Sequence, residues 1–287
     1  MMRITLGIDR NSCIKCGKCV KVCPSDIFSQ KGNASAIEIT FIERCILCGH
    51  CVGVCPTGAV LHSYFTVDKV HKTDYSQLPS PDALMLLLKN RRSNRAFSKV
   101  PISQKNMDMI LEAAHRAPSG SNAQQVKFVL VTSQEKLRLI TEFTMEVIIS
   151  KLKQLKNPIL KPFIKLVLPD SFKYITPFER LEQAFALGND KILRDATAVL
   201  FIYTPRGSRM GNIDSNLAYQ NGSLMAESLG ISQFYTGFVL SAVKMRKYKL
   251  EEILGIDGEI NAGMALGMPQ FHFKNFIDRK GISVTKI

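Results

Sequence analysis

All eight cysteines of this chain lie in two short stretches near its start. The stretches read CIKCGKCVKVCP (residues 13–24) and CILCGHCVGVCP (residues 45–56). They begin 32 positions apart and agree at nine of twelve positions. Each has the spacing C-x2-C-x2-C-x3-C-P, which is typical of ligands for a [4Fe–4S] cluster. Three thiolates on one tight loop bind three irons of a cube, and the fourth iron needs a thiolate from elsewhere in the chain.

The spacing therefore predicts two crossed ligand sets, because the fourth cysteine of such a run ligates the other cluster in two-cluster proteins. One predicted set is Cys13, Cys16, Cys19 and Cys55, and the other is Cys45, Cys48, Cys51 and Cys23. Gly17 and Gly49 follow the second cysteine of each stretch, where the lack of a side chain relieves backbone crowding. The repeat predicts two clusters of the same type.

Zinc binding and disulfide formation are two other uses of such cysteines. Zinc usually takes four ligands from two C-x2-C pairs. Eight cysteines with the spacing seen here fit such a site poorly. Four disulfides would be typical of a small exported domain. The rest of the 287-residue chain contains no cysteine, and its first ten residues have no apolar stretch that predicts a secretory signal.

Residues 1–65 resemble bacterial-type two-cluster ferredoxins on the strength of this doubled run. The resemblance implies a ferredoxin domain whose clusters transfer single electrons, since every iron already has its thiolate. The chemistry that these electrons serve is expected in the remaining residues.

The chain after the cysteines reads as a linker followed by a layered domain. Residues 66–80 are polar, lack a helical period and end in Pro-Ser-Pro, so we predict a linker there. Ser80, Ser103 and Ser133 each precede a helical pattern as N-caps. Strands are predicted at VKFVLVT, TAVLFIYT, QFYTGF and INAGMALG, with further helices over 213–229 and 242–254. Such alternation predicts an α/β or α+β domain over residues 81–287.

Two local patterns in this second domain suggest a cofactor that contains phosphate. RRSNRAF places Arg91, Ser93 and Arg95 close together after a helix, and forked guanidinium groups suit phosphate. The open alternative is a solvated basic helix end. APSGSNAQQ (residues 117–125) is a loop of small and amide residues that lets the backbone approach a flat ring; by itself it could equally be an ordinary turn. No dinucleotide or P-loop glycine motif occurs.

The order of these patterns resembles the FMN-dependent nitroreductase family over about residues 81–282. R-R-S-x-R-x-F is followed by a helix and then A-P-S-x-x-N-x-Q. YQNGSLMAESLGISQFYTGF then looks like the family's central helix and the strand–turn that faces the flavin N5 edge, and ALGMP with DRKG looks like its last strand and basic phosphate contact. The implied fold class is α+β: a ferredoxin-type two-cluster domain followed by a nitroreductase-like α/β sandwich.

The resemblance implies the following contacts to FMN. Arg91, Ser93 and Arg279 hold the phosphate, with Lys280 next to Arg279. Arg95 reaches the ribityl chain or the N1/O2 side of the flavin, and it is the candidate stabiliser of that side. The residues beside the ring are Pro118, Ser119, Gly120 and Asn122, with Thr236 and Gly237 near N5. No side chain is identified as a general acid.

Two departures from the family pattern are visible. Gln125-Val126 stands where many members have Pro-Trp after the loop glutamine. Residues 145–180 form a long insertion. Its stretch 150–175 contains one acid, Asp170, and six lysines: Lys151, Lys153, Lys156, Lys161, Lys165 and Lys173. We predict a basic amphipathic segment over the active site or at a subunit edge. A membrane-surface role is the alternative, which Pro158, Pro162 and Pro169 disfavour because they interrupt any long helix.

These observations predict a cytoplasmic iron–sulfur flavoprotein oxidoreductase and a homodimer. Electrons would pass through two [4Fe–4S] clusters to FMN, which would reduce a small organic acceptor such as a nitroaromatic or a quinone. The donor could be an external ferredoxin or NAD(P)H, and the sequence identifies neither donor nor acceptor. Two alternatives stay open: an electron-transfer module that relays electrons between FMN and a protein partner, and a redox-sensing iron–sulfur protein. The formal charge of +14 is spread over the chain without interleaved aromatic residues, so no nucleic acid partner is expected, and no apolar run is long enough to predict a membrane span.

Overall fold

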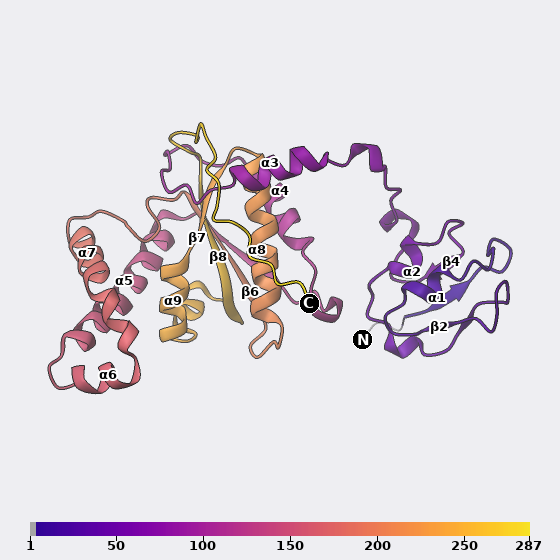
Figure 1. The fold of residues 1–287 in the computed structure, drawn as a ribbon, viewed down its shortest axis with the longest axis horizontal. Helices are drawn as coiled ribbons and strands as arrows, with labels where there is room; N and C mark the ends of the chain where they lie inside the picture. Colours follow the sequence, from indigo (N-terminus) through magenta and orange to yellow (C-terminus); the bar gives the residue numbers. More distant parts are fainter. Residues whose placement is uncertain (1–3) are drawn as a thin grey trace. The chain divides into compact units, whose positions relative to one another are not determined.

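The computed structural model describes residues 4–287, shown as a ribbon in Figure 1. The first three residues of the predicted ferredoxin domain, which also belong to the first ten residues in which no secretory signal is predicted, lie outside the described residues. The chain divides into two compact units. The first comprises residues up to Pro79 together with Gly120–Ala123, and the second comprises Ser80–Ser119 with Gln124–Ile287.

The first unit is built from short elements around the cysteine stretches. Strand β1 (Leu6–Ile8) pairs antiparallel with β4 (Val60–His62), and β2 (Phe28–Ser29) pairs antiparallel with β3 (Glu38–Ile39). The remaining elements are α1 (Lys18–Val22), η1 (Ile42–Arg44), α2 (His50–Gly53), η2 (Val67–Lys69) and η3 (Tyr75–Gln77). The last two lie within the predicted linker. The small apolar core combines strand residues with cysteines: Ile27, Phe28, Ile37 and Val60 are buried together with Cys19.

The sequence repeat reappears in the backbone of this unit. Positive φ angles recur 32 positions apart: Lys15 (55°) with Leu47 (54°), Gly17 (69°) with Gly49 (71°), and Asp26 (51°) with Gly58 (67°). Left-handed backbone is uncommon outside glycine, so its recurrence indicates that both cysteine loops have the same conformation. Gly17 and Gly49 are also the N-caps of α1 and α2.

The second unit contains a four-stranded antiparallel sheet in the order β5-β6-β8-β7. Its strands are β5 (Lys127–Val131), β6 (Ala198–Thr204), β7 (Ser232–Tyr235) and β8 (Glu259–Gly267). Its helices are α3 (Pro81–Asn90), α4 (Gln104–His115), α5 (Gln134–Lys156), α6 (Lys161–Val167), α7 (Ile175–Ala186), α8 (Gly211–Ser228), α9 (Gly237–Met245) and α10 (Lys249–Leu254), with η5 (Pro169–Tyr174) between α6 and α7. The short turn η4 (Gly120–Asn122) falls in the stretch grouped with the first unit. Together with the first unit, this mixed helix and sheet content confirms the predicted α+β class.

Both faces of the sheet are covered by helices, which explains why its strands read as continuous apolar runs. Alternate residues of β6 point to opposite faces. Val199 and Phe201 join a core with α5 and α9, whereas Leu200 and Ile202 join a core with α4 and α8. Helices α8 and α9 lie beside the sheet in Figure 1.

The three serine N-caps are confirmed, whereas one predicted helix is divided into two. Ser80, Ser103 and Ser133 each accept a hydrogen bond from the backbone N–H three residues on, at 3.2, 3.3 and 3.5 Å. The prediction of one helix over 242–254 is wrong. The structure has α9 and α10 there instead, because Tyr248 takes a left-handed conformation (φ 66°) and breaks the helical path. The predicted strand QFYTGF ends at Tyr235, since α9 already begins at Gly237.

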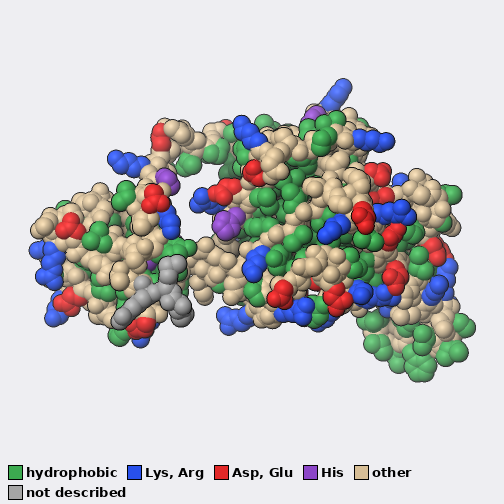
Figure 2. Space-filling model, turned by 180° about the vertical axis from the view of Figure 1, so that it is seen from behind, with side chains coloured by type: hydrophobic (Ala, Val, Ile, Leu, Met, Phe, Trp, Pro, Cys, Tyr) green, Lys and Arg blue, Asp and Glu red, His purple; other side chains and the backbone are tan. Residues whose placement is uncertain are grey.

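The insertion forms a lobe made by the C-terminal half of α5 together with α6, η5 and α7, and α6 lies at its far end in Figure 1. Pro162 stands in the first turn of α6 and Pro169 in that of η5, so the prolines interrupt the helices as predicted. Apolar side chains gather at the tip in Figure 2; Phe163 and Leu166 of α6 are 68% and 83% exposed. None of the helices in the part of the chain that the structure describes is both long and apolar enough to span a membrane.

Candidate functional site

Two small cavities lie among the cysteines of the first unit. One is lined by Cys13, Cys16, Cys19 and Cys55. The other is lined by Cys23, Cys45, Cys48 and Cys51. Each therefore has three thiols from one stretch and one from the other, which is the donor set of a cubane cluster. Within residues 4–287 no three histidine, cysteine or acidic side chains converge on a single metal position. Cubane ligands have no need to converge in this way, because each thiolate binds a different iron.

The two loop glycines are required by their surroundings as well as by their φ angles. A Cβ atom on Gly17 would lie 2.7 Å from Gln30 Oε1, and one on Gly49 would lie 3.1 Å from Phe65 Cζ. Each glycine thus leaves space that a later side chain of the same unit fills. Substitution at either position would combine backbone strain with a steric clash.

Burial changes the acidity of the thiols in the metal-free chain. It raises the pKa of Cys51 to about 11 and raises that of Cys19 as well, because a buried thiolate loses solvation. Since the thiolate is the metal ligand, binding of iron has to release these protons.

His62 lies beside one of the cysteine sets, and the sequence reasoning did not single it out. Its Nε2 is 3.5 Å from Cys45 Sγ, and its Nδ1 accepts a hydrogen bond from the Tyr64 backbone N–H at 3.1 Å. The residue is 6% exposed, and burial lowers the pKa of its imidazole. A histidine seven residues after the last cysteine of a run was the only sequence signal, and it has no meaning without the fold.

In the second unit, the RRSNRAF segment (residues 91–97) is held against strand β7, and we call it the arginine motif. Arg91 follows the last residue of α3, and Ser93 forms an isolated parallel bridge with Gln233 of β7. The Gln233 amide donates to the Arg92 carbonyl oxygen at 3.3 Å and accepts from the Tyr219 hydroxyl at 2.9 Å. These bonds fix the backbone from which Arg91 and Ser93 extend.

A second set of bonds joins the same segment to the residues after β8. Asn94 Nδ2 donates to the Phe271 carbonyl oxygen at 3.1 Å, and the Gln270 N–H donates to the Ala96 carbonyl oxygen at 3.0 Å. The Phe97 ring stacks on Phe234 of β7, with centroids 5.9 Å apart. The arginine motif is therefore fixed by tertiary contacts on two sides.

Arg91 and Arg95 lie near the buried hydroxyl of Tyr219. Burial raises the pKa of Tyr219 to about 12, and the charges of the two arginines partly oppose that rise. Arg95 is exposed; its Nη1 donates to the Ser93 carbonyl oxygen at 3.2 Å, and its guanidinium lies 5.4 Å from the centre of the Phe234 ring. Both arginines thus act on the Tyr219 hydroxyl, which in turn bonds to Gln233 of β7.

Strand β7 leads directly into the predicted N5 turn. The Thr236 N–H donates to the Gly263 carbonyl oxygen at 3.0 Å, while the buried Thr236 Oγ1 has no hydrogen-bond partner within the described residues. A Cβ atom on Gly237 would meet nothing within 4 Å. Open space at Gly237, two arginines near the same strand and the N–H groups of the first turn of α9, which a helix leaves without intrahelical partners, fit a flat ring with a phosphate tail.

The predicted ring-side loop has strained backbone. Ser121, Asn122 and Gln124 have φ angles of 51°, 53° and 48°, and Ser119 Oγ accepts from the Gln124 N–H at 2.9 Å, which closes the loop. Within the first unit, the Asn122 amide donates to the carbonyl oxygens of Ile46 and Leu47 at 3.0 and 2.8 Å. In the structure the Asn122 side-chain amide therefore forms hydrogen bonds with the backbone of the second cysteine stretch. Pro118 and Gly120 belong to the same loop.

Arg279 and Lys280 are exposed in the segment that follows β8. Three residues before Arg279, the Phe276 ring lies 5.3 Å from Lys89 Nζ near the end of α3. The segment thus passes the helix that Arg91 follows. No bond in the described residues fixes the Arg279 side chain beside Arg91 or Ser93.

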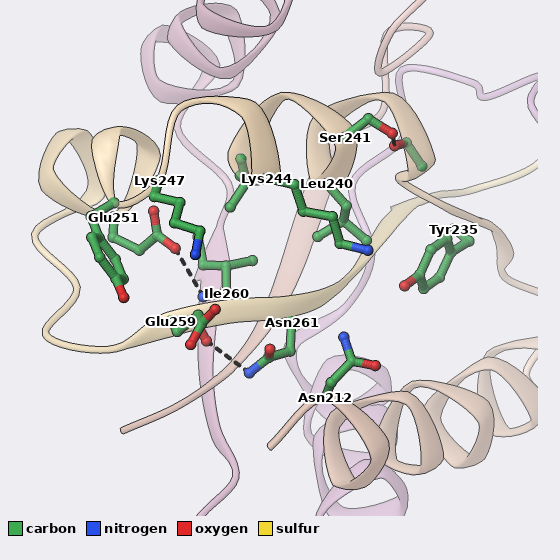
Figure 3. A pocket seen from close by; sticks show the side chains of 13 residues that line it. Asn212, Tyr235, Leu240, Ser241, Lys244, Lys247, Glu251, Glu259, Ile260 and Asn261 are labelled. Atoms are coloured by element: carbon green, nitrogen blue, oxygen red, sulfur yellow. Dashed lines mark hydrogen bonds between the residues drawn. The ribbon is translucent and has the colours of Figure 1, made fainter. Parts of the chain in front are cut away.

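A pocket that the sequence did not predict adjoins Gly237 (Figure 3). Its volume is about 290 Å³, and its lining includes Asn212, Tyr235, Ser241, Lys244 and Lys247. Among its lining residues, Glu251 Oε1 accepts a hydrogen bond from the Ile260 N–H at 2.9 Å. Neither lysine forms an ion pair with another described residue. Lysines three apart near a Thr-Gly turn are too common a pattern to have predicted this pocket.

Comparison with known proteins decides the family. Residues 88–268, more than half of the chain, match the model of the nitroreductase family. The chain belongs to the nitroreductase family. Residues 5–71 match the model of the 4Fe-4S dicluster domain. Both predicted resemblances are therefore confirmed.

Curated relatives share about a quarter of the aligned residues. An FMN reductase (NAD(P)H) of Bacillus subtilis is 26% identical over 63% of this chain and 64% of its own length. An NADPH-flavin oxidoreductase of Vibrio harveyi is 27% identical over 62% of each chain. The chain thus spans less than two-thirds of the length of these relatives.

Solved structures confirm the fold of this nitroreductase-family chain. A nitroreductase with bound FMN from Bacteroides fragilis aligns with a TM-score of 0.51 at 18% identity, covering 71% of this chain and 98% of its own. One from Desulfitobacterium hafniense, also with bound FMN, aligns with a TM-score of 0.53 at 18% identity, covering 70% and 97%.

Proposed function

We propose that this protein is an iron–sulfur flavoenzyme in which electrons pass through two [4Fe–4S] clusters to FMN, which reduces a small organic acceptor such as a nitroaromatic or a quinone. The proposal combines a dicluster domain with a nitroreductase-family unit in one chain. It is supported further by relatives named as flavin reductases and by neighbours whose structures contain FMN. A cytoplasmic location and a homodimer are part of the proposal.

In the first unit, the proposed ligand sets are crossed between the two cysteine stretches. One cluster would be held by Cys13, Cys16, Cys19 and Cys55, and the other by Cys23, Cys45, Cys48 and Cys51, the sets that line the two cavities. The domain boundaries at residues 65 and 81 are proposals of the same kind.

In the second unit, the proposed flavin residues come from the segment after α3, the start of α9 and the C-terminal segment. Arg91 and Ser93 would bind the phosphate, with Arg279 approaching from the C-terminal segment, because charge-assisted bonds to phosphate are stronger than neutral ones. Gly237 would leave room for the ring, and the N–H groups at the start of α9 would face its edge. Arg95 would place a positive charge near the flavin N1/O2 side, where it would favour developing negative charge.

The single observation that supports this function best is the contact between the arginine motif and strand β7. The Ser93–Gln233 bridge and the Phe97–Phe234 stack join the RRSNRAF segment to strand β7, although the paired residues are about 140 positions apart in the chain. A wholly structural role for RRSNRAF would not require a segment with three arginines to be fixed on the strand that leads into the Thr236–Gly237 turn.

The decisive experiment is to purify the protein anaerobically and quantify iron, sulfide and FMN while recording the visible spectrum and acceptor turnover. We expect about eight irons per chain, since each proposed cubane has four. We also expect one FMN and turnover of nitroaromatics or quinones. Clusters and FMN without turnover would instead support a relay to a protein partner. Clusters without FMN would support a redox sensor and refute the flavoenzyme proposal.

A further inference from the structure

The hydrogen bonds of His62 fix which of its ring nitrogens has the proton. The Tyr64 backbone N–H donates to Nδ1 at 3.1 Å, so Nδ1 acts as an acceptor and is not protonated. In a neutral imidazole the proton then lies on Nε2. Nε2 is the nitrogen that lies 3.5 Å from Cys45 Sγ. His62 is therefore oriented to donate a hydrogen bond to this sulfur.

We propose that His62 is a positioning residue that raises the reduction potential of one cluster through an Nε2–H···Sγ hydrogen bond to Cys45. The inference rests on the ligand assignment proposed above, in which Cys45 binds iron. Reduction adds one electron to a cluster and breaks no bond. A hydrogen bond to a ligand sulfur stabilises the more negative, reduced cluster, and such bonds are among the factors that set cluster potentials.

The surroundings of His62 hold the ring in place. It is the last residue of β4, where it pairs with Leu6 of β1, and its ring meets Phe65 edge-on with centroids 4.9 Å apart. The side chain is buried, so water competes weakly for its N–H. A hydrogen bond in such a low-dielectric position is stronger than one in water.

The corresponding side chain of the other repeat has a different role. Gln30 stands 32 positions before His62, just as Cys13 stands 32 positions before Cys45. Its Nε2 donates to the carbonyl oxygens of Lys15 and Ser35, both at 2.9 Å. Of these two equivalent side chains, only His62 lies within hydrogen-bond distance of a cysteine sulfur. The two clusters of an otherwise repeated fold should therefore differ in potential.

The test is a potentiometric titration of the anaerobic full-length protein followed by electron paramagnetic resonance. In His62→Leu the midpoint potential of one cluster should fall while that of the other stays in place. We expect about a tenfold change in the ratio of reduced to oxidised cluster, which for one electron corresponds to ~59 mV. His50→Leu is the matched control, because His50 lies between two cysteines of the second stretch but is exposed. This control should leave both potentials unchanged. Unchanged potentials in His62→Leu, or an equal shift of both clusters, would overturn the proposal.

A second measurement needs no substitution at His62, in case His62→Leu fails to assemble a cluster. The chain has five histidines, so wild-type protein can be labelled with ¹⁵N-histidine and its reduced clusters examined for hyperfine coupling to nitrogen. Coupling to one cluster that persists in labelled His50→Leu supports the proposal. Absence of coupling with both clusters present would refute it. Iron near one or two per chain in the wild type would instead refute the ligand assignment beneath it.

Discussion

The two units of this molecule assemble their sites in opposite ways. In the first unit all eight cysteines come from two stretches of twelve residues, and each loop repeats the φ angles of the other. In the second unit the proposed flavin residues are spread from Arg91 to Arg279, and bonds to β7 bring part of this set together. A site built from local loops depends on spacing and on glycine. One built from distant segments depends on the contacts that hold those segments.

The largest effect is expected from breaking the crossed ligation of the first unit. Cys55→Ser should abolish the cluster of the first stretch and Cys23→Ser that of the second, because each proposed fourth ligand comes from the other repeat. Iron analysis and electron paramagnetic resonance should show about half the wild-type iron and one remaining cluster. If Cys55→Ser loses the cluster of its own stretch instead, the ligation is not crossed.

The next effect concerns flavin binding. Arg91→Ala should release FMN on dialysis while the iron–sulfur absorbance persists. A charge-assisted bond contributes about 1.5–3 kcal/mol, so the affinity should fall roughly ten- to hundredfold. Added FMN should restore turnover. The control is Arg116→Ala, which removes an exposed arginine paired with Glu112 on α4. Equal FMN affinity in Arg91→Ala and the wild type would remove Arg91 from the phosphate site.

A pair of glycine substitutions distinguishes an effect on stability from an effect on FMN binding. Gly263→Ala should lower the stability of the second unit by about 1–3 kcal/mol, since its Cβ would lie 2.4 Å from Thr236 Oγ1 and 2.9 Å from Phe201. The Cβ atom of Gly237→Ala meets nothing within 4 Å among the described residues, so the melting temperature of this variant should stay near that of the wild type while FMN binding weakens. Thermal unfolding and flavin titration measure both effects. Normal FMN affinity in Gly237→Ala would show that the ring does not approach this turn.

The smallest effect is expected at the pocket beside Gly237. Lys244→Met should raise the KM for an acceptor with a carboxylate about two- to fivefold, with little change for its neutral amide, because exposed charges interact weakly in water. Steady-state kinetics at low and high salt compare the carboxylate acceptor with its amide. Lys249→Met is the control, because Lys249 does not line the pocket. An equal change for both acceptors would mean that the lysine does not recognise charge.

The spacing of the cysteines predicted some features of the first unit and could not predict others. The doubled run predicted two clusters and the resemblance to a dicluster ferredoxin, and the match to the family model bears out the latter. His62 escaped notice because its role depends on β1–β4 pairing and on the Tyr64 N–H, and neither can be read from distance along the chain.

The sequence by itself determined the elements with strong local causes. Serine caps began three helices where predicted, and apolar runs gave β5, β6 and β8. Local patterning could not place the break at Tyr248, because a left-handed tyrosine has no sequence signature and is tolerated only where surrounding packing favours it.

Only the tertiary structure decided which distant residues share a strand end, which nitrogen of His62 faces a sulfur and where a pocket opens beside Gly237. The physical reason is the range of the interactions. Caps, turns and cysteine spacing act within a few residues and leave a record in the sequence. Bridges such as Ser93–Gln233 form between segments that meet only after the sheet and its helices have packed.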